Sequence, residues 1–185
     1  MRMLGLYWAL LYVVASGSAA AQDWSGADAA TKRLKPSEFT HIPAAIRAEL
    51  EHRGCTVPQP YGAMHPANIV SGRFTTGKQM DWAALCSRER VSVILVFREG
   101  LTTDVAELAP EPDIGYLQKI ADGIIGYSRN IGVADARYIR EHHDLRSLAV
   151  LPPLDHEGIN DTFVEKGSVV WYWSGSRWLQ LAGAD

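Results

Sequence analysis

The chain contains two cysteines, Cys55 and Cys86, and their redox state is the strongest single constraint on its fold. If the two are joined, the segment that ends at Cys55 must lie against the segment that carries Cys86. Disulfides persist in exported proteins and are rare where glutathione keeps thiols reduced. Whether a disulfide is expected therefore depends on whether the chain is exported.

The N-terminus has the three-part pattern of a secretory signal peptide. Arg2 supplies the positive charge, an apolar run covers Leu4 to Val14, and small residues fill positions 16–21. The apolar run is well short of the roughly 20 residues that a membrane-spanning helix needs. The pattern predicts a signal peptide over residues 1–21, cleaved near Ala21, and a periplasmic or secreted mature chain.

An even number of cysteines in an exported chain predicts one disulfide, Cys55–Cys86. A metal pair, a redox couple and two free thiols are the alternatives. There is no C-x-x-C spacing, and zinc needs more ligands than two distant cysteines provide. The predicted disulfide closes a loop of about 30 residues, worth roughly 3–4 kcal/mol in the chain-entropy model.

Composition indicates an ordinary globular domain, because 47% of the residues are hydrophobic and 21% are charged. The formal net charge of −3 argues against a general nucleic-acid or anionic-membrane binder. No second apolar run approaches membrane-spanning length. We expect no nucleic-acid partner, no membrane span in the mature chain and no cofactor.

Periodicity predicts two helices after a flexible lead-in over residues 22–36. The first covers Pro43 to Arg53, where apolar residues recur at steps of three and four, and Gly54 ends it immediately before Cys55. The second covers Ala134 to Leu145. The predicted disulfide would therefore pin the first helix to the segment around Cys86.

Strand patterns fill most of the remaining chain. We expect strands at 68–74, 80–87 and 91–97, an exposed loop at 100–113, short strands within 114–128, and a hairpin from Ser168 to Leu181. The strand at 91–97 is apolar on both faces, as in a sheet covered on both sides. Residues 37–185 are thus predicted to form a single small α+β domain, mainly an antiparallel sheet with two helices and one disulfide.

Several segments resemble a set of uncharacterised exported bacterial proteins that have one disulfide and no known activity. The matching segments are 54–59, 81–87, 94–97, 158–161, 163–166 and 178–181. The resemblance covers most of the mature chain. It implies export and a disulfide, and it implies nothing about chemistry.

A local similarity to one repeat of the calcium-binding integrin-type propeller motif lies at Gly72-Arg73-Phe74 and Asp81-Trp82-Ala83. In that motif the intervening loop is rich in aspartate, which supplies oxygen ligands for calcium. Here the loop at 75–80 has no carboxylate, and the motif occurs once. The segment is therefore predicted to be a plain strand–turn–strand.

Ionisable residues are densest between Glu141 and Asp161. His143 (or His142), Asp155 and His156 could form a metal shell or an acid–base site, since both need histidine beside carboxylates. The alternative is a solvated helix end followed by a polar loop, because cationic histidines suit a helix C-terminus. No H-E-x-x-H pattern is present.

Tryptophans form a row in the C-terminal hairpin. Trp171 and Trp173 share one face of a strand, and Trp178 is expected to lie opposite them. An exposed row would suit stacking on a glycan, whereas an inward row would be core. Val170 and Tyr172 on the other face are also bulky, so alternation does not decide which face is buried.

No nucleophile elbow or phosphate-binding glycine loop accompanies these candidates. The sequence therefore favours a non-catalytic binding or interaction protein of the bacterial envelope, with an envelope protein or a glycan as partner. A metal-dependent or acid–base hydrolase that uses the cluster at 142–161 is the alternative.

Overall fold

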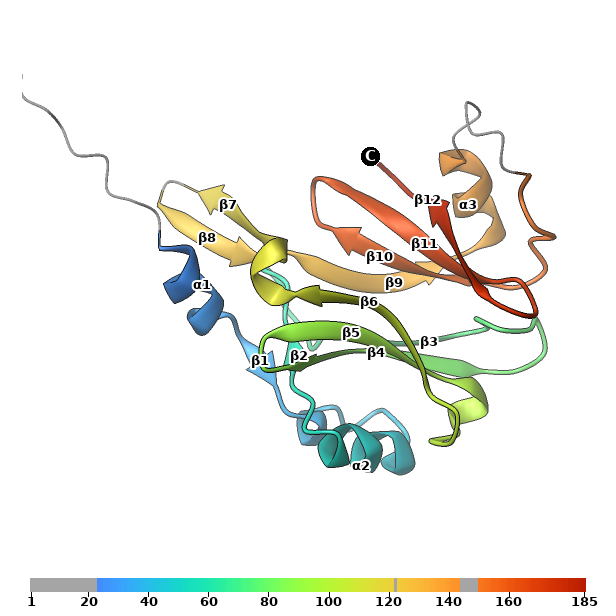
Figure 1. Ribbon diagram of the computed structural model, residues 1–185, viewed down its shortest axis with the longest axis horizontal. Coiled ribbons are helices and arrows are strands. Elements are labelled where there is room, and N and C mark those ends of the chain that lie inside the picture. Colours follow the sequence, from blue (N-terminus) through green and yellow to red (C-terminus); the bar gives the residue numbers. More distant parts are fainter. Residues whose placement is uncertain (1–22, 122, 144–149) are drawn as a thin grey trace, which may run out of the picture.

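The first sheet forms around the hairpin of β4 (Asp81–Arg88) and β5 (Val91–Phe97) in the computed structural model, which describes residues 23–121, 123–143 and 150–185. Glu89 and Arg90 both have positive φ, as a tight two-residue hairpin turn requires. The edge strands β3 (Ile69–Gly72) and β6 (Ala106–Pro112) complete an antiparallel sheet in the order β3-β4-β5-β6 (Figure 1).

The second sheet is also antiparallel, with the order β12-β11-β10-β9. Its strands are β9 (Arg129–Ala134), β10 (Gly158–Phe163), β11 (Gly167–Trp173) and β12 (Trp178–Ala182). The last two form the hairpin that the sequence predicts. Two smaller pairs are β1 (Arg33–Leu34) with β2 (Val57–Pro58), and β7 (Leu117–Ala121) with β8 (Ile124–Tyr127).

The helices are short. The described residues contain α1 (Trp24–Ala30), α2 (Ala44–His52) and α3 (Ala136–His142), with 3-10 turns η1 (Pro36–Glu38), η2 (Arg98–Gly100) and η3 (Asp113–Tyr116). The predicted helices at 43–53 and 134–145 correspond to α2 and α3. No helix in the described part of the chain is long and apolar enough to cross a membrane.

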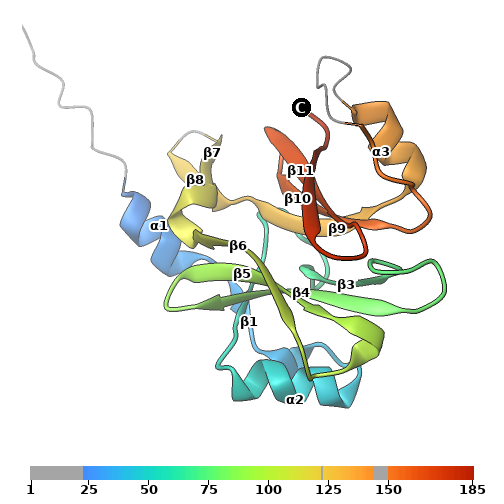
Figure 2. The same cartoon turned by 45° about the vertical axis from the view of Figure 1, so that its right-hand side comes forward.

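The layers follow one another as α2, the β3–β6 sheet, the β9–β12 sheet and α3 (Figure 2). Strand β5 is buried on both faces, as its sequence predicts. One face packs Leu95 and Phe97 in the cluster that contains Ile46 and Leu50 of α2. The other face packs Ile94 and Val96 against the second sheet, whose core residues here are Ile131 and Ile159. A third cluster lies between the second sheet and α3, and contains Ala134, Ile139, Val170 and Tyr172.

Asn68 joins the two sheets along the side where β3 meets β9. Its side-chain amide donates to the carbonyls of Pro58 (2.6 Å) and Arg129 (3.1 Å), and its Oδ1 accepts from the Ile131 N–H (2.9 Å). The residue is buried and has φ of 71°. Asparagine adopts this left-handed conformation more readily than most residues. Its side chain therefore supplies the hydrogen bonds that a regular strand pair would make here.

We expect Asn68→Gly to destabilise the protein by about 1–3 kcal/mol, because buried backbone groups lose their partners. Glycine keeps the positive φ at no steric cost, so Asn68→Ala should be more destabilising than Asn68→Gly. Urea unfolding followed by circular dichroism measures both. Stabilities within 0.5 kcal/mol of the parent for both variants, about the scale of surface changes, would contradict this role.

The predicted disulfide is present between Cys55, directly after α2, and Cys86 in β4, with 5.0 Å between their Cα atoms. Both residues are buried in the cluster beneath α2. The predicted signal peptide over residues 1–21 lies outside the described residues.

The prediction of a flexible lead-in over 22–36 is wrong, because α1 and β1 occupy most of it. Asp23 caps α1 by accepting from the Gly26 N–H. The buried Asp28 forms an ion pair with Arg33 (2.7 Å), which also pairs with the fully buried Asp113 (2.7 Å). A seven-residue helix is not stable alone in water, so these tertiary contacts hold it.

Two further predictions need correction. The expected exposed loop at 100–113 contains β6, and the single sheet with two helices is in fact four antiparallel sheets with three helices among the described residues. Pro110 and Pro112 led to the prediction of a loop, because proline is rare within sheets except at edges and bulges. Strand β6 has both features, since it is an edge strand and Ala109 has φ of 49° at an irregularity in its pairing with β5.

Candidate functional site

Three of the predicted site residues line one cavity. Asp155, His156 and Trp173 border a space of about 750 Å³ between the β3–β4 turn and the β11–β12 turn. His143 follows α3 as its C-cap residue, at the boundary of the undescribed residues 144–149. Nowhere in the described part of the chain do three His, Cys, Asp or Glu side chains gather in a way that could hold a metal ion. The structure therefore does not bring His143, Asp155 and His156 together as a metal shell.

His156 contacts other parts of the protein through both ring nitrogens and through the face of its ring. Its Nδ1 lies 2.9 Å from the carbonyl oxygen of Glu157, and its Nε2 lies 2.9 Å from that of Trp173. Its ring stacks on Tyr172 at 4.1 Å between centroids. Carbonyl oxygens only accept, so both ring nitrogens face hydrogen-bond acceptors. These contacts hold the segment that precedes β10 against β11. They leave no free nitrogen lone pair for a metal or a substrate.

The tryptophan row faces the first sheet and is half-buried. Trp171 and Trp178 pack against the core between the sheets. The Arg98 guanidinium lies over the Trp173 ring at 4.4 Å, and Trp173 and Trp178 are 5.5 Å apart. The opposite face of β11 holds the buried Val170 and Tyr172. The row is therefore neither an open platform nor full core. Trp173 borders the cavity of about 750 Å³, and Trp171 borders a second cleft.

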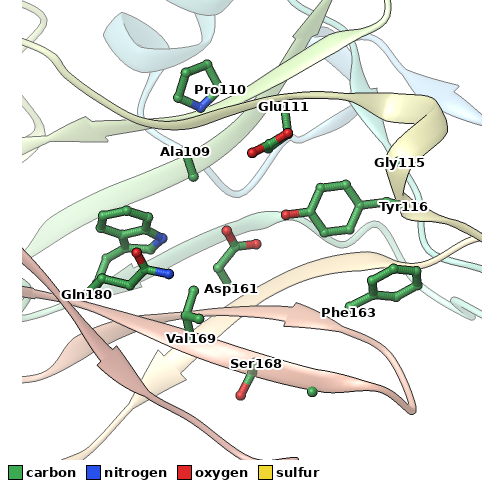
Figure 3. A pocket seen from close by; sticks show the side chains of 12 residues that line it. Ala109, Pro110, Glu111, Gly115, Tyr116, Asp161, Phe163, Ser168, Val169 and Gln180 are labelled. Atoms are coloured by element: carbon green, nitrogen blue, oxygen red, sulfur yellow. The ribbon is translucent and has the colours of Figure 1, made fainter.

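That cleft lies between the two sheets, on the side opposite Asn68, and has a volume of about 550 Å³ (Figure 3). It is bounded by the end of β6 and η3 on one side and by β10, β11 and β12 on the other. Its chemically distinctive lining residues are Glu111, Tyr116, Asp161, Phe163, Trp171 and Gln180. In Figure 3 the side chains of Glu111, Tyr116 and Asp161 point toward one another across it.

A buried ion pair fixes Asp161. Arg129 is fully buried, and its Nε and Nη2 donate to the two oxygens of Asp161 at 2.9 and 2.8 Å. The guanidinium also donates to the carbonyl and hydroxyl oxygens of Ser92 and to the carbonyl of Ala109. Burial opposes its charge, but the hydrogen bonds and attraction to Asp161 outweigh this and raise the pKa of Arg129. Arg129 therefore stays charged and joins three strands, β5, β6 and β9, to Asp161 on β10.

Tyr116 adds a hydroxyl group to the cleft. The Arg129 guanidinium lies 4.6 Å from the centre of its ring. Burial raises the pKa of Tyr116; Arg129 opposes that shift, and the negative charges of Asp161 and Glu111 reinforce it. The phenol therefore keeps its proton at neutral pH and can donate a hydrogen bond into the cleft.

Trp171 contributes an unsatisfied donor. Its Nε1 is buried and has no hydrogen-bond partner among the described residues. An indole nitrogen can only donate, and buried donors are usually paired. The nitrogen has almost no exposed surface, so a ligand in the cleft meets the accessible part of the Trp171 ring rather than its N–H.

Comparison of the chain with known proteins finds no matching family model, no matching curated protein and no matching solved structure. The similarity to exported bacterial proteins thus stays a prediction.

At the propeller-like motif, Asp81 closes the turn by accepting from the N–H (2.8 Å) and the hydroxyl (2.7 Å) of Thr75 and from Gln79 (3.0 Å). The loop at 75–80 is held by its own hydrogen bonds.

Proposed function

We propose that this chain is an exported, non-catalytic binding domain of the bacterial envelope, and that its ligand occupies the cleft between the two sheets. The convergence of Glu111, Tyr116 and Asp161 in one cleft carries the proposal. The volume of about 550 Å³ lies within the range of about 300–1,000 Å³ common for small-ligand sites. The disulfide indicates an oxidising compartment, which supports an envelope location.

The chemistry of the lining favours binding over catalysis. The lining residues contain no histidine or cysteine, the usual general base and the strongest nucleophile. Arg129 already engages both oxygens of Asp161, which fixes that carboxylate as an acceptor. Groups held on two packed sheets suit recognition of a ligand with matching hydrogen bonds.

Blocking the cleft tests the proposal. A Cβ built at Gly115, on the rim of the cleft, meets no atom within 4 Å, so Gly115→Trp can add a large ring there with the fold retained. Gly132 in β9 has equally open surroundings and lies outside the cleft lining, which makes Gly132→Trp the matched control. Both variants and the parent are purified oxidised from a bacterial periplasm. They are titrated calorimetrically with soluble cell-wall fragments, lipopolysaccharide core oligosaccharides and envelope-derived peptides.

We expect one class of ligand to bind the parent and the Gly132→Trp variant, with binding to Gly115→Trp at least about tenfold weaker, a loss of about 1.4 kcal/mol. Mass spectrometry should recover that ligand unchanged. Binding that ignores Gly115→Trp, conversion of the ligand, or no binding by the parent would each overturn the proposal.

A further inference from the structure

Resting on the proposed function, we infer that the ligand of the inter-sheet cleft is a neutral saccharide. The donors, acceptors, rings and charges of the lining fit this class of ligand better than a cation or an anion. The relevant groups are the indole ring of Trp171, the phenol of Tyr116, the phenyl ring of Phe163, the carboxylates of Glu111 and Asp161, and the amide of Gln180.

The lining requires a ligand that both donates and accepts hydrogen bonds. The protonated hydroxyl of Tyr116 can donate, and the amide of Gln180 can both donate and accept. Glu111 is an acceptor once ionised and needs a donor, whereas both oxygens of Asp161 already accept from Arg129. A sugar hydroxyl is donor and acceptor at once, so adjacent hydroxyls can satisfy both kinds of group.

The position of Gln180 extends the same pattern along the strands. Gln180 of β12 lies directly opposite Trp171 of β11 in the sheet register, so their side chains share one face. Its amide offers both a donor and an acceptor beside the Trp171 ring. This pairing of an amide with an aromatic ring suits a hydroxylated sugar ring.

A cationic ligand fits less well, although the lining is acidic. The Arg129 guanidinium already lies against the Tyr116 ring at 4.6 Å, and the Lys166 ammonium lies over the Phe163 ring at 4.4 Å. The cation–π positions on those ring faces are therefore filled from within the protein. An ammonium or guanidinium group has no acceptor for the proton of the Tyr116 hydroxyl or for the donor end of the Gln180 amide.

An anionic ligand fits least well. The residues that line the cleft include Glu111 and Asp161 and no lysine or arginine. The positive charge of Arg129 is directed at Asp161 rather than at the open space. Like-charge repulsion would therefore oppose a phosphate or carboxylate in the cleft. A neutral saccharide leaves the charges where they are and gains stacking area on the exposed parts of the rings.

Calorimetric titration with neutral oligosaccharides tests the inference, with short oligomers of N-acetylglucosamine and of glucose as probes. Lysine- and arginine-containing tripeptides form the second arm. Tyr116→Phe keeps the ring and removes the hydroxyl donor, whereas Tyr61→Phe makes the same change outside the cleft lining. We expect saccharide binding to the parent and to Tyr61→Phe, and about tenfold weaker binding to Tyr116→Phe. Circular dichroism verifies that each variant is folded.

The outcomes separate the inference from the proposal on which it rests. Binding of a cationic tripeptide that Gly115→Trp blocks, with no saccharide bound, would overturn the saccharide assignment and leave the cleft as a binding site. Saccharide binding that is equal for Tyr116→Phe and Tyr61→Phe would overturn the role of the Tyr116 hydroxyl and with it the inference. Absence of any ligand from the cleft of the parent would overturn both.

Discussion

Replacing Arg129 by methionine is expected to lower the free energy of unfolding by about 3–5 kcal/mol. The loss follows because Asp161, with 5% of its surface exposed, would keep a carboxylate with no partner in a buried position. The carbonyl groups of Ser92 and Ala109 would lose their donor as well. Methionine fills a similar volume without charge, so the change isolates the lost ion pair from a cavity. Urea unfolding followed by circular dichroism measures the effect.

Arg137→Met supplies the matched control, because that side chain is 81% exposed and its contact with Glu141 is 3.9 Å long. We expect a change below about 0.5 kcal/mol there. The double variant Arg129→Met/Asp161→Leu removes both charges and should be more stable than Arg129→Met alone. A single variant as stable as Arg137→Met, or a double variant less stable than the single one, would contradict this account of the pair.

The elements that the sequence predicts well are those specified by local patterns. Helix α2 follows from its apolar stripe and Gly54, and the β4–β5 and β11–β12 hairpins follow from apolar runs separated by short turns. Covering of β5 on both faces could be predicted because a strand that is apolar on both sides has no face for water. The disulfide follows from the cysteine count and the expected export.

The elements that the sequence does not predict depend on contacts far along the chain. Helix α1 is held by Arg33 and through it by Asp113, 80 residues further on. Strand β6 contains two prolines and tolerates them only as an edge strand with a bulge. Strands β9 and β10 contain Gly132, Gly158, Asn160 and Asp161, residue types that are typical of turns. In each case tertiary structure outweighs local propensity.

The sequence does not predict the cleft either, because its residues come together only through contacts between distant parts of the chain. Arg129 and Asp161 are 32 residues apart and belong to no motif, and the sequence does not distinguish a buried arginine from an exposed one. The densest ionisable cluster suggested His156 instead, whose ring nitrogens both contact backbone carbonyls. The tryptophan row did contain a useful signal, since Trp171 borders the cleft. The side of the sheet it faces depended on where α3 packs, which no local pattern records.

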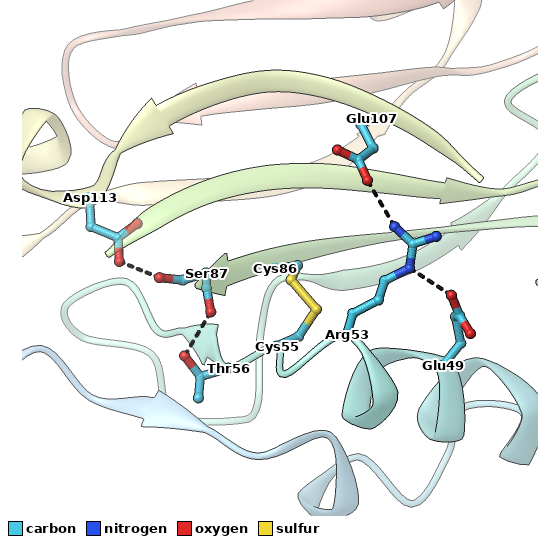
Figure 4. The surroundings of a disulfide bond; sticks show 8 residues. All are labelled: Glu49, Arg53, Cys55, Thr56, Cys86, Ser87, Glu107 and Asp113. Carbon is cyan, nitrogen blue, oxygen red and sulfur yellow. Dashed lines mark hydrogen bonds and ion pairs between the residues drawn. A yellow bond between two sulfur atoms is a disulfide. The ribbon is translucent and has the colours of Figure 1, made fainter. Parts of the chain in front are cut away.

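Breaking the disulfide is the second large effect. Cys86→Ala should lower the melting temperature of the oxidised protein and leave that of the reduced protein nearly unchanged. The bond joins the end of α2 to β4, which lies in the middle of the first sheet (Figure 4). It closes a loop between residues 31 apart, for which the chain-entropy model gives roughly 3–4 kcal/mol at 25 °C.

Contacts beside the disulfide hold the same segments together in the reduced protein. The melting temperatures of the oxidised and reduced proteins can therefore be compared. The Thr56 and Ser87 backbones bridge beside the bond, Ser87 donates to Asp113 at 2.6 Å, and Arg53 pairs with Glu107 at 2.8 Å (Figure 4). Differential scanning calorimetry of the parent, Cys86→Ala and Cys55→Ala, each with and without reductant, gives the required temperatures. The two variants should agree with each other and with the reduced parent, because all three lack the same cross-link. An equal drop in the presence and absence of reductant would instead assign the effect to the packing of the Cys86 side chain, which is fully buried.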